Sequence, residues 1–227
     1  MSSAENFARE EICRVGKSLF ERGYVHATAG NISVRLDDGI LITPTDACLG
    51  FLDPARLAKM DLNGQPISGD KASKTIALHR CIYTATAPFD SAMRCIIHTH
   101  SRHCVALTLQ HSYRAEADAE LLPPVTPYFV MKVGHVPVIA YHRPGDPAAA
   151  ALVGQAIRRY GQRGTPIHAV MLERLGPNVW HDSPAAAMAT LEELEETAKL
   201  MLTCTQPPQP LSETQIDELR QTFNAVW

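Results

Sequence analysis

The sequence predicts an α/β fold in which a mixed β-sheet is covered by helices. Segments with helical spacing of apolar residues alternate with short apolar runs that are typical of strands. Some neighbouring strands are joined by hairpin turns and others are separated by a helix, so we expect both antiparallel pairs and crossovers. At 227 residues the chain is long enough for one sizeable core.

The first half of the chain begins with an amphipathic helix over residues 6–22, which Gly23 ends. Residues 31–36 and 39–43 are predicted strands, because the Asp-Asp-Gly sequence between them is typical of a hairpin turn. The remaining predicted elements are a helical turn at residues 53–54, a second hairpin around residues 61–64 and a helix over residues 73–85.

The second half continues with a short buried strand, residues 93–97, that runs directly into His98. After it we predict helices over residues 101–110, 148–160 and 185–204, strands over residues 136–140 and 168–172, and an irregular stretch over residues 121–127. The tail contains one further amphipathic segment. We therefore expect one domain over residues 1–205 and a C-terminal arm or helix over residues 206–227.

Composition excludes several classes of protein. The net charge is −3 and the basic residues are scattered, so nucleic acid is not an expected partner. No apolar run reaches the roughly 20 residues that cross a bilayer, and the acidic start lacks signal-peptide features, so we expect no membrane association and a cytoplasmic location. The six cysteines are dispersed and are expected to be free thiols.

The sharpest local motif is His98-Thr99-His100 at the end of a predicted strand. Two-residue periodicity would place both imidazoles on one side, where they could bind one cation. The pair alone is weak support, because histidines at this spacing also arise by chance on surfaces.

A second group of segments offers contacts for a phosphate. The turn at residues 28–33 supplies backbone amides and Asn31, residues 41–45 add hydroxyls, and residues 68–74 add further hydroxyls, the cation of Lys74 and possible helix N-terminal amides. Each segment by itself could equally be an ordinary turn or a helix cap.

Taken together and in order, these segments resemble the class II aldolase and adducin-head family, which includes the L-fuculose-phosphate aldolases, and within it most resemble the 3-oxo-tetronate 4-phosphate decarboxylases. The resemblance spans roughly residues 7–204. The matching segments lie at residues 28–35, 42–45, 49–54, 68–70, 78–79, 98–101, 124–128, 141–146 and 191–199.

The resemblance implies a three-layer α/β/α fold with a largely antiparallel sheet, and a C4 homotetramer with each active site at a subunit boundary. It implies a divalent metal, zinc or alternatively manganese or cobalt, with His98 and His100 as ligands. It also implies a phosphorylated small-molecule substrate and a proton-donor role for Tyr128, which could otherwise be a buried aromatic. The positions carried over to the phosphate are Asn31, Thr43, Thr45 and Ser73.

Two positions depart from the family pattern. The glutamate expected four residues before His79 is Thr75, and the histidine expected after the late strand is Leu175. Catalytic zinc usually has three protein ligands, and this chain supplies two. Candidates for a replacement ligand are His103, His168, His181 and Glu173, although His103 more naturally supports the site from outside.

Two hypotheses follow. The first is a metal-dependent decarboxylase or lyase that acts on a small phosphorylated sugar acid through an enediolate. The second is a catalytically silent relative that keeps the fold, the oligomer and phosphate binding. Decarboxylation is favoured over aldol cleavage, because aldol cleavage needs the base that position 75 lacks.

Overall fold

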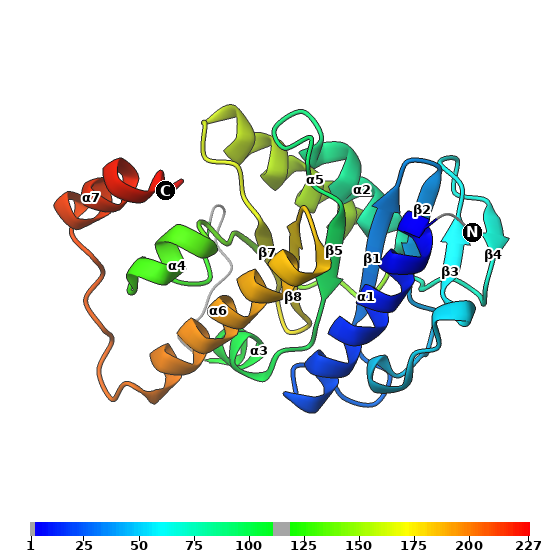
Figure 1. Cartoon of the computed structure of the whole chain (residues 1–227). Helices are drawn as coiled ribbons and strands as arrows, with labels where there is room; N and C mark the ends of the chain where they lie inside the picture. The colour runs from blue at the N-terminus through cyan, green and yellow to red at the C-terminus, as the bar shows by residue number, and fades with distance from the viewer. Residues whose placement is uncertain (1–2, 111–118) are drawn as a thin grey trace.

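The computed structural model describes residues 3–110 and 119–227 and contains one eight-stranded sheet between layers of helices (Figure 1). The strand order is β4-β3-β2-β1-β5-β8-β7-β6. Every neighbouring pair is antiparallel except β6 and β7, which are parallel. The predicted mixed, largely antiparallel α/β/α architecture is confirmed.

The elements of the sheet and its cover have these bounds. The strands are β1 (Asn31–Leu36), β2 (Gly39–Ile42), β3 (Ala58–Met60), β4 (Pro66–Ser68), β5 (Cys95–His98), β6 (Val138–Ile139), β7 (Ala169–Leu172) and β8 (Gly176–His181). The α-helices are α1 (Ser3–Glu21), α2 (Ile76–Thr86), α3 (Arg102–Leu109), α4 (Pro127–Lys132), α5 (Pro147–Gln162), α6 (Pro184–Thr203) and α7 (Glu213–Phe223). Two 3-10 turns, η1 (Leu49–Phe51) and η2 (Pro54–Arg56), lie between β2 and β3.

Two hydrophobic clusters occupy the two faces of the sheet. On β5, Cys95 and Ile97 point toward the cluster under α1, α3, α4 and α6, whereas Ile96 points toward the cluster under α2 and α5. On β8, Val179 points toward the cluster under α1, α3, α4 and α6, and Trp180 points toward the cluster under α2 and α5. This alternation follows from the two-residue period of a strand, and it fixes the face on which each polar side chain lies.

The structure corrects four details of the sequence prediction. The strand expected over residues 136–140 is reduced to Val138–Ile139, and the helix expected from residue 73 begins only at Ile76. Strand β8 and helix α4 were not predicted. A proline and an asparagine interrupt the apolar pattern of β8, and α4 has only six residues, begun by Pro127 and capped by the Thr126 hydroxyl, which accepts from the amide of Phe129 at 3.1 Å.

The C-terminal segment is attached to the body at several points. Ile216 of α7 is buried, and α7 packs against α4. The Trp227 ring stacks on His135 with centroids 4.2 Å apart and meets Phe129 of α4 at 5.8 Å. Figure 1 shows α7 and α4 at the same end of the molecule.

All six cysteines are free, as predicted. Among residues 3–110 and 119–227, none of the helices has the length and apolar character needed to cross a bilayer.

Candidate functional site

A row of three polar side chains crosses the middle of the sheet. Asn31 of β1 is directly opposite His98 of β5, and His98 is directly opposite Asn178 of β8. Directly opposed residues of an antiparallel pair point to the same face, so all three lie on the face covered by α2 and α5. All three are buried. This row is the centre of the candidate site.

His98 is held in one tautomer. Its Nδ1 lies 3.0 Å from the carbonyl oxygen of Pro177, and because a carbonyl only accepts, Nδ1 carries the proton. The Nε2 lone pair is therefore free for another contact. Burial, together with neighbouring His100, lowers the pKa of His98 to about 3, which keeps the ring neutral.

His100 follows the end of β5, and its ring meets that of His98 edge to face with centroids 5.1 Å apart. The predicted pairing of these imidazoles is therefore present, although only His98 belongs to the strand. Burial and the nearby His26 lower the pKa of His100. The His26 ring lies 6.2 Å from that of His100.

His79 of α2 approaches the same face from above the sheet. Its Nδ1 is 2.7 Å from the Ser33 hydroxyl, which also contacts the Tyr83 hydroxyl at 2.9 Å. Burial, with a smaller effect of His98, lowers the pKa of His79 to about 3. Its Nε2 is buried without a hydrogen-bond partner, as are the Asn31 Oδ1 atom and both amide atoms of Asn178.

The predicted phosphate contacts are brought together in part. The amide of Ser73 donates to the carbonyl of Thr43 at 3.2 Å, and the amide of Ile32, next to Asn31, donates to the Thr43 hydroxyl at 3.2 Å. Lys74 follows at the start of α2, with its ammonium exposed and 3.9 Å from Asp46. These contacts place Asn31, Thr43 and Ser73 around one end of the row.

Thr45 lies slightly apart from this group. Its amide donates to the carbonyl of Lys71 at 2.9 Å, and it lines a cavity of about 260 Å³ that it shares with Asp46, Asp53 and Asp70. One cation, Arg56, also lines the cavity but is paired with Asp70 at 2.7 Å, so the three carboxylates make it a poor place for an anion. Thr45 therefore stays a candidate only through its backbone position beside Thr43.

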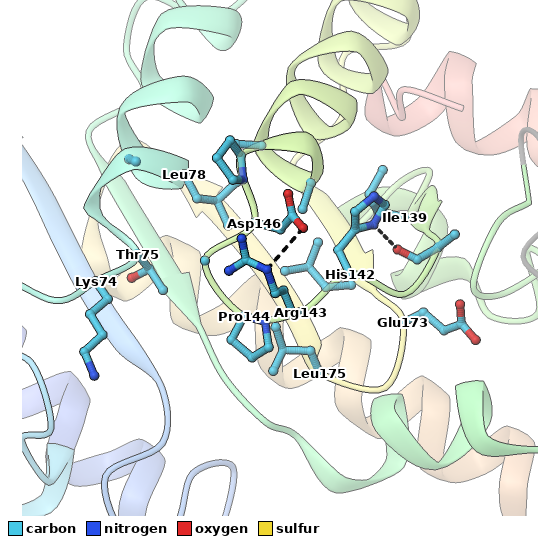
Figure 2. A pocket seen from close by; sticks show the side chains of 17 residues that line it. Lys74, Thr75, Leu78, Ile139, His142, Arg143, Pro144, Asp146, Glu173 and Leu175 are labelled. Carbon is cyan, nitrogen blue, oxygen red and sulfur yellow. Dashed lines mark hydrogen bonds and ion pairs between the residues drawn. The ribbon is translucent and has the colours of Figure 1, made fainter.

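Thr75 and Leu175 line one pocket of about 180 Å³ (Figure 2). The Thr75 hydroxyl is 2.9 Å from that of Ser73, and Leu175 packs against the hydrophobic cluster under α2 and α5. The pocket is bounded by the start of α2, the loop between β6 and α5, and the turn between β7 and β8. The two positions that depart from the family pattern thus face a common space.

The donor set does not fit a resident catalytic cation. His98 and His100 offer neutral imidazoles, but Leu175 has no lone pair and Thr75 has a neutral hydroxyl already engaged by Ser73. In the part of the chain that the structure describes, no cluster of three or more His, Cys, Asp or Glu side chains is placed to hold a metal ion. Two imidazoles fall short of the three protein ligands usual for catalytic zinc.

The candidate replacement ligands have other contacts. The Nδ1 of His103 lies 2.9 Å from the buried carboxylate of Glu195. His168 and His181 stack on one another at 5.3 Å, and His181 ends β8 at the opposite end from Gly176. Glu173 lines the pocket of Leu175, where its carboxylate accepts from the amide of Tyr141 at 2.8 Å.

Tyr128 lies on α4 and is 62% exposed, so it is not the buried aromatic residue of the alternative interpretation. It belongs to the opposite helical layer from the one that covers the His98 row. Within one copy of the chain, the structure does not bring Tyr128 to that row.

Sequence reasoning missed four residues of the site. Asn178 lies in a strand that was not predicted, and His79 was noted only within a helical pattern and a matching segment, without a role in the site. His26 lies five residues before Asn31, just ahead of the phosphate turn, which was the available signal. Arg143, which lines the pocket of Thr75 and Leu175, was quoted only within a matching segment.

A comparison with known proteins agrees with the fold and with the order of the matching segments. The family model described as "Class II Aldolase and Adducin N-terminal domain" matches residues 10–202, and the chain belongs to this family. Members of the family generally use a divalent metal. This chain, with only two of the expected metal ligands, therefore departs from that general pattern of the family.

Two curated relatives are named 3-oxo-tetronate 4-phosphate decarboxylase. The protein from Cupriavidus necator is 51% identical over 230 residues, covering 99% of this chain and 100% of the relative. The protein from Escherichia coli strain K12 is 37% identical over 221 residues, covering 96% and 98%.

Solved structures agree. YgbL from Escherichia coli, described as an aldolase, epimerase or decarboxylase, has a TM-score of 0.83 at 36% identity and covers 96% of this chain and 100% of its own. L-fuculose-1-phosphate aldolase from Thermus thermophilus has a TM-score of 0.70 at 28% identity, covering 88% and 93%.

Proposed function

We propose that the chain is a decarboxylase of a small phosphorylated sugar acid of the 3-oxo-tetronate 4-phosphate type. The observation that carries the proposal is the row across the sheet, in which Asn31, beside Thr43 and Ser73, is directly opposite His98. One end of this row offers hydrogen-bond donors and hydroxyls for a phosphate, and the other offers neutral polar groups for the reacting end. The names of the full-length relatives support the same activity.

The reaction needs little covalent chemistry from the protein. In a 3-oxo acid, the bond between the carboxylate carbon and its neighbour breaks, carbon dioxide leaves, and the electron pair enters the adjacent carbonyl to form an enediolate. The carbon that lost the carboxylate then takes up a proton. Holding the phosphate at Asn31, Thr43, Ser73 and Lys74 would fix the distance between the anchored end and the reacting end.

We propose Tyr128 as the donor of that proton. A phenol hydroxyl is a suitable acid toward an enediolate carbon. Because Tyr128 is exposed on the opposite helical layer, the proposal requires an active site at a boundary between copies, as in the homotetramer that the family resemblance implies. Tyr128 of one copy would then donate the proton to a substrate bound at the Asn31–His98–Asn178 row of another copy.

Position 75 favours decarboxylation over aldol cleavage. Aldol cleavage requires a base that removes the proton of the cleaved hydroxyl, and the Thr75 hydroxyl, 2.9 Å from Ser73, is not such a base. Decarboxylation passes through the same kind of enediolate without that step. We therefore place the chain among carbon–carbon lyases that release carbon dioxide.

No step of this proposal is assigned to a cation. If a cation contacts this chain, we propose His98 and His100 as its contacts and zinc as the cation, with manganese or cobalt as alternatives, because neutral imidazoles suit these metals. We further propose a cytoplasmic homotetramer without a nucleic-acid or membrane partner, in line with the scattered charge of the sequence.

The activity is tested with three compounds offered separately to the purified chain. We expect release of carbon dioxide from 3-oxo-tetronate 4-phosphate to be faster than cleavage of a ketose 1-phosphate, and faster than decarboxylation of the unphosphorylated acid. Faster ketose cleavage would contradict the assignment. An absence of turnover on all three compounds would favour the catalytically silent relative.

A further inference from the structure

The pocket that Thr75 and Leu175 share has the composition of a site for a small organic acid. Most of its wall is apolar, with Leu78, Ile139 and Leu172 beside Leu175. Its volume of about 180 Å³ is sufficient for part of a small metabolite but not for a peptide or a nucleotide. A cationic side chain, Arg143, enters this apolar space from the loop between β6 and α5 (Figure 2).

Arg143 is held loosely and can accept a ligand. Its Nε lies 3.7 Å from the Asp146 carboxylate, beyond hydrogen-bond distance, and its side chain is 70% exposed. The other oxygen of Asp146 accepts from the amide of Ala148 at 3.0 Å and caps α5. The backbone of the loop is fixed by a turn in which the amide of Asp146 donates to the carbonyl of Arg143 at 3.1 Å. The turn thus fixes the backbone of Arg143, and its guanidinium makes one long ion pair with Asp146.

The second acid of the pocket does not compete for the guanidinium. The Glu173 carboxylate accepts from the amide of Tyr141 at 2.8 Å, and its other oxygen lies 3.6 Å from Arg174. The second cation, Lys74, is also on the pocket wall. Lys74 and Thr75 follow Ser73 directly, so the pocket adjoins the proposed phosphate contacts at the start of α2.

We propose that this pocket binds the carboxylate of the substrate and that Arg143 is the residue that recognises it. The inference rests on the proposed function, because it uses a ligand whose phosphate occupies the adjoining contacts. The planar guanidinium fork matches the two oxygens of a carboxylate. With the phosphate held at the adjoining contacts, the carboxylate is the remaining anion of a phosphorylated sugar acid, and a phosphorylated alcohol or ketone lacks it.

The test compares two unreactive ligands with the same phosphate. The first is 4-phosphoerythronate, a phosphorylated four-carbon sugar acid, and the second is glycerol 3-phosphate, which lacks the carboxylate. By isothermal titration calorimetry, we expect the wild-type chain to bind the acid at least about 10-fold more tightly. In Arg143→Gln this preference should fall below about 3-fold, because only the carboxylate contact is lost.

A variant that should raise the affinity for the acid strengthens the test. Asp146→Asn keeps an N-cap side chain for α5 but removes the charge that restrains Arg143, so affinity for the acid should rise. Arg143→Lys should retain only part of the preference, since an ammonium lacks the fork. Arg163→Gln is the matched control, because Arg163 is an exposed arginine at the other end of α5, about 24 Å along the helix.

The outcomes separate the two proposals. An unchanged preference in Arg143→Gln overturns the assignment of Arg143 while leaving the proposed function intact. Binding preference without any decarboxylation supports the pocket and contradicts the proposed reaction. Failure of the wild-type chain to bind either phosphorylated ligand overturns both.

Discussion

His98 and Asn178 are directly opposite one another on β5 and β8. In the Asn178 side chain, neither the amide nitrogen Nδ2 nor the amide oxygen Oδ1 has a hydrogen-bond partner in the structure. A buried amide without partners costs free energy, typically about 1–3 kcal/mol. The sheet therefore contains a destabilised position beside the imidazole that the family resemblance identifies as a ligand. Buried polar groups without hydrogen-bond partners are often found in sites that bind a ligand.

Replacing this amide by an apolar group should stabilise the free chain. We expect Asn178→Leu to raise the free energy of unfolding by about 1–2 kcal/mol, since no bond is lost and a desolvation cost is removed. Chemical denaturation measures the change. Ser33→Ala is the contrasting variant, because its hydroxyl contacts His79 and Tyr83 and its removal should destabilise. A marked loss of stability in Asn178→Leu would show that the amide has a partner in solution.

Restoring the two family side chains should create a metal site. The double variant Thr75→Glu with Leu175→His would regain the four-ligand set that the family resemblance implies, and we expect close to one zinc per chain after dialysis at micromolar zinc. The wild-type chain should retain far less, and each single variant an intermediate amount. Metal analysis of the dialysed proteins gives the answer. Equal zinc in the wild type and the double variant would contradict the incomplete donor set.

The buried His79 predicts an acid-sensitive fold. Its folded-state pKa of about 3 lies below the ordinary value of 6.5, so between these values the unfolded chain binds the additional proton. This contribution to stability is complete above pH 6.5 and is lost progressively as the pH falls toward 3, with a slope of up to ~1.4 kcal/mol per pH unit. His98 is shifted in the same direction.

His79→Gln isolates this contribution. The variant keeps a polar group near Ser33 but cannot titrate, so its unfolding free energy should decline less between pH 7 and pH 5 than that of the wild type. Denaturation curves at both pH values measure the difference. Parallel declines in the two proteins would mean that folding does not lower the pKa of His79.

The sequence predicted the order of most elements because periodicity and turn residues are local signals. It identified His98 and His100 from their spacing, and Thr75 and Leu175 from the family pattern. It could not identify Asn178, because its role depends on which residue of another strand lies opposite, and strand register is not a local property. The importance of Arg143 was also hidden, since its pocket is assembled from three distant segments.

The central claim is tested most directly with 3-oxo-tetronate 4-phosphate carrying carbon-13 at its carboxylate, incubated with the wild-type chain and followed by nuclear magnetic resonance. We predict that the label moves to carbon dioxide and bicarbonate at a saturable rate far above that in buffer, and that a three-carbon hydroxyketone phosphate accumulates in equal amount. A rate no greater than in buffer would contradict the claim.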